Sequence, residues 1–349
     1  MRSTRVYRWL TITCACCLSL LLTACNTLPA PTITPTHNPL AFLTVHNQSQ
    51  HVALPLGSLY EMYEGHTSMV FGVDWSPDGK RIASASLDGT VQVWDAMTGK
   101  HVLIYRGHNG PVFSVRWSPN GQYIASAGYD HTVQIWDAAT GKTLLVYHGH
   151  TALVSTASWS PDGQLIASGG DDGTVQIWQA MTGKHVLTYQ DHPGHVTEIE
   201  WSPDGKRLAI ASDNGTVQVI DASTGKTLVT YGDHHIGIWA VSWSPDGKRI
   251  ASGGGDHIVH IWNSQTGATL FLYKGHSSYI HAVAWSPNGK YVASGGYDQS
   301  VQVWNPNNGA MLMEYHGHKD TIVDLAWSAN SQDIASASFD KTVQVWLAE

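Results

Sequence analysis

The sequence predicts an all-β fold in which seven copies of one four-stranded antiparallel unit close into a single domain. A tryptophan before a serine-led turn recurs every 42 residues, and such fixed self-similarity indicates a repeat architecture. Between these landmarks, short runs of β-branched and apolar residues alternate with turn residues. The last copy also lacks the fourth of these runs. The seven landmark tryptophans are Trp75, Trp117, Trp159, Trp201, Trp243, Trp285 and Trp327.

The first copy shows the four predicted strands of the unit. Residues 70–75 and 82–86 are apolar or small, and the Ser-Pro-Asp-Gly turn at 76–79 joins them into a hairpin. Residues 90–94 alternate and are rich in β-branched side chains, which predicts a third strand. Residues 101–105 follow a Thr-Gly-Lys turn and form the fourth. A sheet this small is not stable alone, so neighbouring copies must cover its faces.

The two ends of the repeat array complement each other. The last copy stops at Trp346 without a fourth strand, whereas residues 59–63 precede the first copy and align with residues 101–105. We therefore expect the N-terminal segment to complete the final unit and close the ring. Such closure hides sheet edges that would otherwise pair with other chains.

Five copies open with Gly-His, as at Gly65-His66, and the fourth and fifth open with Asp-His; most close with Trp-Asp or a close variant, as at Trp94-Asp95. With a period in the forties, these landmarks resemble the WD-repeat β-propeller over residues 59–349. The resemblance implies seven blades around a central channel, with a hydrogen-bonded His, Ser, Asp and Trp tetrad inside most blades. Carried over to six copies, the structural tetrads are His66, Ser84, Asp88 and Trp94; His108, Ser126, Asp130 and Trp136; His150, Ser168, Asp172 and Trp178; His234, Ser252, Asp256 and Trp262; His276, Ser294, Asp298 and Trp304; and His318, Ser336, Asp340 and Trp346.

The fourth copy departs from this pattern. Ile210, Asn214 and Ile220 replace the serine, aspartate and tryptophan, while His192 remains. Three coherent losses predict that apolar packing replaces the polar network, which is close to neutral when all partners change together. Because the tetrad recurs in six copies, we interpret it as structural and not as a set of catalytic triads.

Differences between the copies point to a functional surface. The serine-led and Thr-Gly-Lys turns hardly vary, whereas the loop after Gly-His and the turn before the tetrad aspartate change in almost every copy. The resemblance implies that this loop-bearing end binds partners. Apolar and aromatic candidates are joined by two acids in copies three and four, which suits a peptide or protein with basic and apolar groups. The alternative is that these side chains only pack into the loops and the channel mouth. The candidates are Met69, Phe71, Leu87, Phe113, Tyr129, Asp171, Asp213, Trp239, Tyr279, Tyr297 and Phe339.

A histidine cluster around the fourth copy is a candidate metal site. His192, His195 and His235 lie near acidic residues in the sequence, and imidazole and carboxylate are suitable zinc ligands. Histidine is common in this chain, however, and no zinc-binding spacing is present. Solvated loop histidines are therefore the expected interpretation, and we expect neither a metal nor another cofactor.

The N-terminal 50 residues differ in composition from the repeats. Three arginines precede an apolar run at 9–22, which predicts a signal peptide over residues 1–24. Residues 22–25, Leu-Thr-Ala-Cys, resemble a bacterial lipobox, so Cys25 is the expected lipidation site; an uncleaved anchor is the alternative. Residues 25–50 hold four prolines and predict an extended tether, followed by the propeller at 51–349. Both interpretations place the propeller outside the cytoplasm, held at a bacterial membrane by its N-terminus.

The net charge and the absence of catalytic motifs limit the classes of function that the sequence supports. The formal net charge is −8, and it becomes more negative if the leader with its three arginines is removed. This acidity argues against nucleic acid or an anionic lipid surface as the partner, so the membrane contact is the anchor alone. No nucleophile elbow, zinc-protease motif or phosphate-binding loop is present. We expect a monomeric, non-enzymatic scaffold that binds a protein or peptide; the alternatives are an exported propeller hydrolase or metal-dependent enzyme, and a spacer without a specific ligand.

Overall fold

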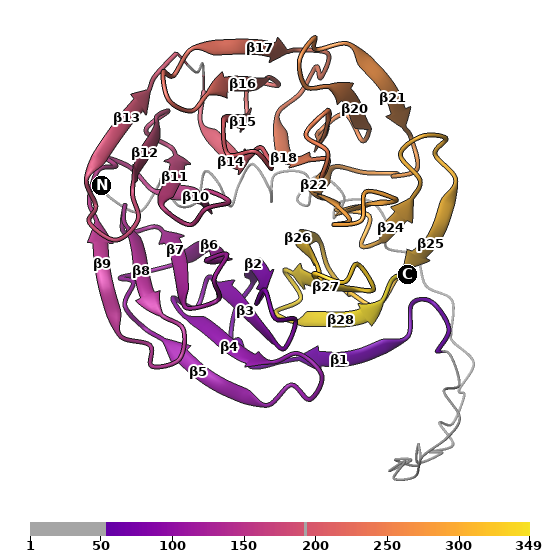
Figure 1. Ribbon diagram of the computed structural model, residues 1–349. Coiled ribbons are helices and arrows are strands. Elements are labelled where there is room, and N and C mark those ends of the chain that lie inside the picture. The colour runs from indigo at the N-terminus through magenta and orange to yellow at the C-terminus, as the bar shows by residue number, and fades with distance from the viewer. Residues whose placement is uncertain (1–53, 192–193) are drawn as a thin grey trace, which may run out of the picture. The chain divides into compact units, whose positions relative to one another are not determined.

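The computed structural model describes residues 54–191 and 194–349, in which 28 β-strands form seven four-stranded antiparallel sheets. The sheets stand around a centre as the blades of a propeller (Figure 1). Within these two ranges no helix is long and apolar enough to span a membrane. The predicted signal peptide, Cys25 and the tether lie outside the described residues.

The seven four-stranded sheets confirm the predicted all-β, seven-bladed fold.

Six blades are built in chain order from the innermost to the outermost strand, and the last blade takes β1 as its outermost strand. The innermost strands are β2 (Val70–Trp75), β6 (Val112–Trp117), β10 (Val154–Trp159), β14 (Val196–Trp201), β18 (Ile238–Trp243), β22 (Ile280–Trp285) and β26 (Ile322–Trp327). The second strands are β3 (Arg81–Ser86), β7 (Tyr123–Gly128), β11 (Leu165–Gly170), β15 (Arg207–Ser212), β19 (Arg249–Gly254), β23 (Val292–Gly296) and β27 (Asp333–Ser338).

The two remaining strands of each blade lie toward the outside of the ring. The third strands are β4 (Val91–Asp95), β8 (Val133–Asp137), β12 (Val175–Gln179), β16 (Val217–Asp221), β20 (Val259–Asn263), β24 (Val301–Trp304) and β28 (Val343–Leu347). The outermost strands are β5 (His101–Tyr105), β9 (Thr143–Tyr147), β13 (His185–Tyr189), β17 (Thr227–Tyr231), β21 (Thr269–Tyr273), β25 (Met311–Tyr315) and β1 (Leu59–Tyr63).

The N-terminal strand closes the ring, as predicted. β1 pairs antiparallel with β28, with Tyr63 opposite Val343 and Leu59 opposite Trp346. The last blade therefore takes three strands from the C-terminus and one from the N-terminus (Figure 1). This pairing leaves the third strand of the final blade without a free edge, and it fastens the two ends of the array together.

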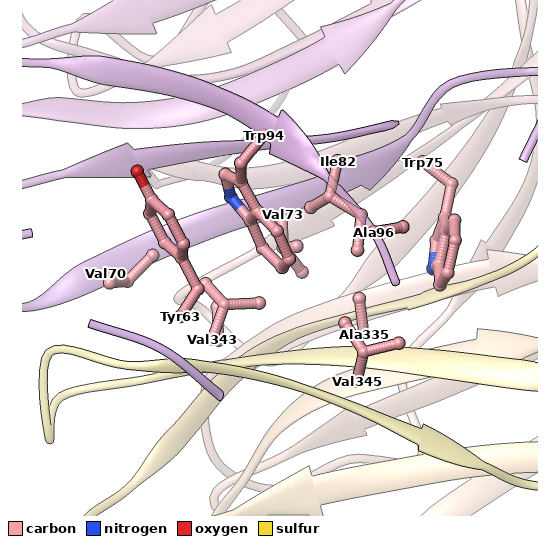
Figure 2. Close-up of a cluster of buried hydrophobic side chains, with 11 residues drawn as sticks. Tyr63, Val70, Val73, Trp75, Ile82, Trp94, Ala96, Ala335, Val343 and Val345 are labelled. Carbon is pink, nitrogen blue, oxygen red and sulfur yellow. The ribbon is translucent and has the colours of Figure 1, made fainter. Parts of the chain in front are cut away.

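The hydrophobic core lies between neighbouring blades. At the closure, Val70, Val73 and Trp94 of the first blade pack with Val343 and Val345 of the last (Figure 2). The other six clusters occupy the equivalent positions at the successive blade junctions. Because every blade buries both faces against its neighbours, the ring is one cooperative core and not seven separate ones.

A β-bulge recurs at the start of every innermost strand. In the first blade the register between β2 and β3 shifts between Val70 and Gly72, and the equivalent shift occurs in the other six. The residue inside the bulge, Phe71 in this blade, is half-buried between buried neighbours. Bulges redirect side chains near functional sites. Here the bulge turns one variable residue per blade toward the centre of the ring.

Candidate functional site

The tetrad residues are joined by short contacts inside six blades. In the sixth blade, His276 lies between Ser294 and Asp298, with Nε2 2.7 Å from Ser294 Oγ and Nδ1 2.8 Å from Asp298 Oδ2. Trp304 Nε1 donates to the same Ser294 Oγ at 3.0 Å. Five other blades repeat the three contacts at the positions proposed from the sequence. These networks link the loop to the second and third strands of the same blade.

The tetrad aspartates are held in the ionised form. Burial opposes the charge on Asp88, but hydrogen bonds from His66 and Thr90 lower the pKa of this carboxyl far below its usual range. The His66 side chain has no exposed surface, and that of Asp88 is 7% exposed. Each histidine and serine is therefore enclosed within its blade, where a substrate could not reach it. This geometry fits a structural network.

A second link, between blades, was not recognised in the sequence. The Tyr63 ring of the last blade stacks on Trp94 of the first, with centroids 4.5 Å apart and planes 4° from parallel. Its hydroxyl donates to Gln92 Oε1 at 2.6 Å. The Gly65 position has no room for a Cβ, which would contact Tyr63 Oη and lie 2.7 Å from Gln92 Oε1. In the five repeats that open with glycine, this residue therefore leaves room for a tyrosine that joins adjacent blades.

The fourth blade is packed with apolar side chains where the others carry the tetrad. Ile210 and Ile220 are fully buried and lie in one cluster with Ile199. Asn214 stays in the turn, where its Oδ1 accepts a hydrogen bond from Thr216 N at 3.0 Å. This agrees with the predicted replacement of the polar network by apolar packing. His192, the remaining tetrad residue, lies outside the described residues.

The two variable segments of each blade lie side by side. In the first blade, Leu87 N donates to Met69 O at 2.9 Å, which ties the turn before the tetrad aspartate to the loop after Gly-His. The same bond connects Tyr129 to Pro111, and its equivalents recur in the other blades. Of the eleven proposed partner-binding residues, ten are half-buried and Asp213 is exposed. They share one end of the ring, and most are partly covered by their own loops.

Ring contacts gather the aromatic candidates into two groups. The phenylalanine group consists of Phe71, Phe113 and Phe339, and Phe71 lies 5.3 Å from each of the other two in edge-to-face geometry. The blade-five-six group consists of Trp239, His257, Tyr279, His281 and Tyr297. Tyr279 and Tyr297 are edge to face at 5.7 Å, and the Trp239 and His281 rings stack at 4.7 Å. His257 and His281 were not among the sequence candidates.

The bulge residues of all seven blades surround one recess at the mouth of the channel. This recess has a volume of about 80 Å³, and both aromatic groups contribute to its wall. Two atoms in the wall, His281 Nε2 and Ser155 Oγ, are buried and have no hydrogen-bond partner within the described residues. Burial lowers the pKa of His281 to about 4, so its ring is neutral at physiological pH. The seven bulge residues are Phe71, Phe113, Ser155, Thr197, Trp239, His281 and Val323.

Below the recess lies a charged cluster that sequence reasoning missed. Arg116 Nη1 lies 3.0 Å from Asp324 Oδ2, and Arg116 Nη2 lies 3.6 Å from Glu198 Oε1. Asp74 Oδ2 accepts the Trp117 N–H at 2.6 Å, and Glu200 Oε2 accepts the Trp243 N–H at the same distance. Four carboxyl groups thus surround one guanidinium. Because the five charged groups come from four different strands, β2, β6, β14 and β26, no local sequence motif predicts the cluster.

Burial has the largest effect on the pKa values of the carboxyl groups around Arg116. It raises the pKa of Glu198 and of Glu200 to about 8, and that of Asp74 to about 6. Burial opposes the charge of Arg116 as well, but Asp324 and Asp74 raise the pKa of this side chain further. The carboxyl groups in the channel therefore hold their protons to higher pH than they would in water, and Arg116 stays positively charged. A basic group brought to the mouth would experience an attractive field.

The histidine cluster considered from the sequence is only partly described. His192 lies outside the described residues, and His235 is exposed. His195 Nδ1 lies 2.9 Å from the backbone carbonyl oxygen of Asp171. Among the described residues, three potential metal ligands converge elsewhere, at His234, Asp256 and His260.

Comparison with known proteins agrees with this architecture. A family model for the first beta-propeller of WDR19 matches residues 113–281, and the model for the WD domain, G-beta repeat matches residues 57–95, 267–305 and 309–346. The chain is thus a seven-bladed β-propeller that carries WD40 repeats. Such propellers generally serve as scaffolds for protein interaction.

Similarity to curated proteins is confined to short segments. A guanine nucleotide-binding protein subunit beta from Nicotiana tabacum is 49% identical over 37 residues, which are 11% of this chain and 10% of that protein. Protein Mut11 from Chlamydomonas reinhardtii is 55% identical over 38 residues, also 11% of this chain and 10% of that protein. Gem-associated protein 5 from Homo sapiens is 45% identical over 56 residues, 16% of this chain and 4% of that protein. The chain thus spans a tenth or less of the length of these relatives.

Proposed function

We propose that this propeller is a membrane-tethered scaffold outside the cytoplasm, which binds a protein or peptide at its loop-bearing end. One observation carries the binding proposal: the variable loops of all seven blades converge on one recess, whereas the tetrads and the opposite turns repeat almost unchanged. A scaffold that needed only to fold would not require the two ends to differ in this way.

The composition of the recess suggests the chemistry of the partner. The phenylalanine group and the blade-five-six group offer aromatic surface, which supplies much of the binding energy in protein interfaces. Beneath them, the carboxyl groups of Asp74 and Asp324 outnumber the single guanidinium of Arg116, whereas burial raises the pKa of Glu198 and Glu200 to about 8 and leaves both largely protonated at neutral pH. A segment with apolar side chains flanking a basic residue would satisfy both features.

The binding proposal predicts the behaviour of a double variant. Replacing Tyr279 and Tyr297 by alanine removes an edge-to-face pair, worth about 1 kcal/mol of stability, that packs against Trp239 and His281 in the wall of the recess. The ring should stay folded, while capture of proteins from envelope extract and culture medium should be lost. Capture is measured by affinity purification with the tagged full-length chain, followed by mass spectrometry.

A matched variant at the opposite end controls for nonspecific loss of apolar surface. Met97 and Met181 are 54% and 50% exposed and lie beside the invariant Thr-Gly-Lys turns. Their joint replacement by alanine should leave capture unchanged. If the tyrosine variant retains the same proteins as the wild type, the aromatic recess is not the binding site.

The tether proposal rests on the composition of residues 1–50 and has its own test. Cys25 follows Leu-Thr-Ala, the pattern expected before a lipid-modified cysteine. Radiolabelled palmitate should be incorporated into the wild-type chain in its native host, and Cys25→Ala should abolish labelling and release the protein from the membrane fraction. Cys17→Ala, within the apolar run, is the control and should leave both unchanged. Equal labelling of both variants would exclude Cys25 as the anchor.

A further inference from the structure

The fifth blade differs from the other tetrad blades at two positions beside its aspartate. Every other blade carries a glutamine where the fifth has His260, and a threonine or serine where the fifth has Ile258. The equivalent glutamines are Gln92, Gln134, Gln176, Gln218, Gln302 and Gln344. The equivalent hydroxyl residues are Thr90, Thr132, Thr174, Thr216, Ser300 and Thr342.

These two changes alter what surrounds the tetrad carboxylate. In the first blade, Thr90 Oγ1 donates to Asp88 Oδ1 at 2.6 Å. In the fifth blade, the equivalent oxygen of Asp256 accepts the backbone N–H of Ile258 at 3.2 Å, and the isoleucine side chain offers no hydroxyl. A second imidazole takes up the space instead. The carboxylate has exchanged a neutral hydroxyl donor for a side chain that can ligate a metal.

Three ligand atoms converge on this spot. Asp256 Oδ2 lies 2.8 Å from His234 Nδ1 and 3.0 Å from His260 Nε2, and all three atoms are within 4.8 Å of one another. Bonds of about 2.0–2.2 Å to a tetrahedral ion would place its ligands about 3.3 Å apart. Shifts of a few tenths of an ångström in Asp256 would therefore open the position. The two imidazole rings are partly stacked, with centroids 3.7 Å apart and planes 32° from parallel, so they must also move apart for both nitrogens to face one ion.

The opposite nitrogen of each ring is also engaged, as is typical of metal-binding histidines. His234 Nε2 lies 2.8 Å from Ser252 Oγ, and His260 Nδ1 lies 2.7 Å from Tyr231 Oη. Such outer contacts fix the orientation of the rings and can accept the proton of the nitrogen that does not bind the ion. Both histidine side chains are nearly inaccessible, whereas that of Asp256 is 12% exposed and gives access from solvent.

We propose that His234, Asp256 and His260 bind one divalent transition-metal ion inside the fifth blade, with zinc as the best match. Two imidazoles and one carboxylate suit zinc and its borderline neighbours cobalt and nickel, and they discriminate against calcium and magnesium, which prefer oxygen ligands. Three protein ligands leave a coordination position for water. Without an ion, Asp256 Oδ2 lies within hydrogen-bond distance of both imidazoles, so the three ligand side chains are already held together.

The variant His260→Gln tests the site and introduces the residue found in the six other blades. The full-length chain and the variant are stripped with chelator, incubated with zinc chloride at neutral pH and dialysed, and bound zinc is measured by mass spectrometry. The wild type should retain about one equivalent more than the variant, because only a complete ligand set holds the ion. Zinc should also raise the melting temperature of the wild type more than that of the variant. Other histidines and cysteines are common to both proteins and cancel in the comparison.

A gain-of-site variant keeps the proposal testable even if His260→Gln fails to fold. The double change Gln92→His and Thr90→Ile places the same pair beside His66 and Asp88 of the first blade. It should retain about one equivalent of zinc more than the wild type. Equal zinc in wild type and His260→Gln, with both folded in the presence of chelator, would overturn the proposal and leave a purely hydrogen-bonded network. Equal zinc in the wild type and the gain-of-site variant would overturn it as well.

Discussion

Replacing Trp304 by alanine is expected to destabilise the ring by about 3–5 kcal/mol, the usual cost of truncating a large buried aromatic residue. The Trp304 side chain is fully buried, and its ring stacks on Tyr273 of the preceding blade at 4.1 Å. Its Nε1 also donates to Ser294 Oγ at 3.0 Å, so the variant leaves the tetrad incomplete. One substitution therefore weakens both the core of its own blade and the junction with its neighbour. Chemical denaturation followed by tryptophan fluorescence measures the loss.

Two other variants separate the contribution of packing by the Trp304 ring from that of its hydrogen bond. Trp304→Ile imitates Ile220 of the fourth blade, so it should recover part of the loss by filling space without restoring the hydrogen bond. Met311→Ala, at a side chain that is 50% exposed, should change stability by less than about 0.5 kcal/mol. An unchanged melting temperature for Trp304→Ala would contradict the structural role given to the tetrads.

Replacing Arg116 by methionine is expected to destabilise the propeller by about 2–4 kcal/mol at pH 8. Methionine retains much of the length of the side chain but removes the cation that lies 3.0 Å from Asp324 and 3.6 Å from Glu198. Breaking an ion pair of low exposure leaves its partner charge uncompensated, and this is costlier than the net value of the pair. Because the Arg116 side chain is 28% exposed, we place the effect below that of a fully buried pair.

The effect of Arg116→Met should depend on pH. Burial raises the folded-state pKa of Glu198 and of Glu200 to about 8 from the ordinary glutamate value of 4.5. A carboxyl group with a raised pKa favours the folded state at low pH, and this contribution is lost as pH rises from 4.5 through about 8. The loss caused by Arg116→Met should accordingly shrink toward pH 5, where these carboxyl groups are protonated. Melting curves at both pH values measure the difference.

Glu200→Gln is a control that removes a negative charge from the cluster, whereas Arg116→Met removes the positive charge. Its amide oxygen can still accept the Trp243 N–H, while the charge that is costly to bury disappears. This variant should be more stable than the wild type at pH 8 and nearly equal to it at pH 5. Lys290→Met, which removes an exposed ion pair with Glu349, should have little effect at either pH. An Arg116→Met loss of the same size at both pH values would argue against coupling to the raised carboxyl pKa values.

The fold could be predicted from the sequence because its signals are local and repeated seven times. The hairpin around residues 76–79 depends on a tight turn in which Gly79 has a φ of +69°, a conformation that other residues adopt at a cost. The predicted first-copy strands match β2 to β5 to within one residue at each end. The missing strand at Trp346 also predicted the closure, because an array that ends one strand early must take that strand from elsewhere.

The candidate site could be predicted only in part. Comparison of the copies identified the variable positions, and the loop positions do meet at one end of the ring. It did not identify the grouping of Phe71 with Phe339, or the participation of His281. Arg116 and Asp324 are 208 residues apart in the chain, so neither charge suggests the other in the sequence. The convergence of His260 with the tetrad was also missed, because it depends on which face of β20 the side chain occupies.

The sequence by itself determined the number of blades, their strand order and the way the ring closes, because each depends on turn chemistry and spacing within one repeat or on the count of repeats. Only the tertiary structure decided what lies in the channel and between the blades. The charges of Asp74, Arg116, Glu198, Glu200 and Asp324 become a single cluster when seven innermost strands surround a common axis. Their burial then shifts the protonation of each group, and neither the distances nor the desolvation that cause these shifts exist in the linear chain.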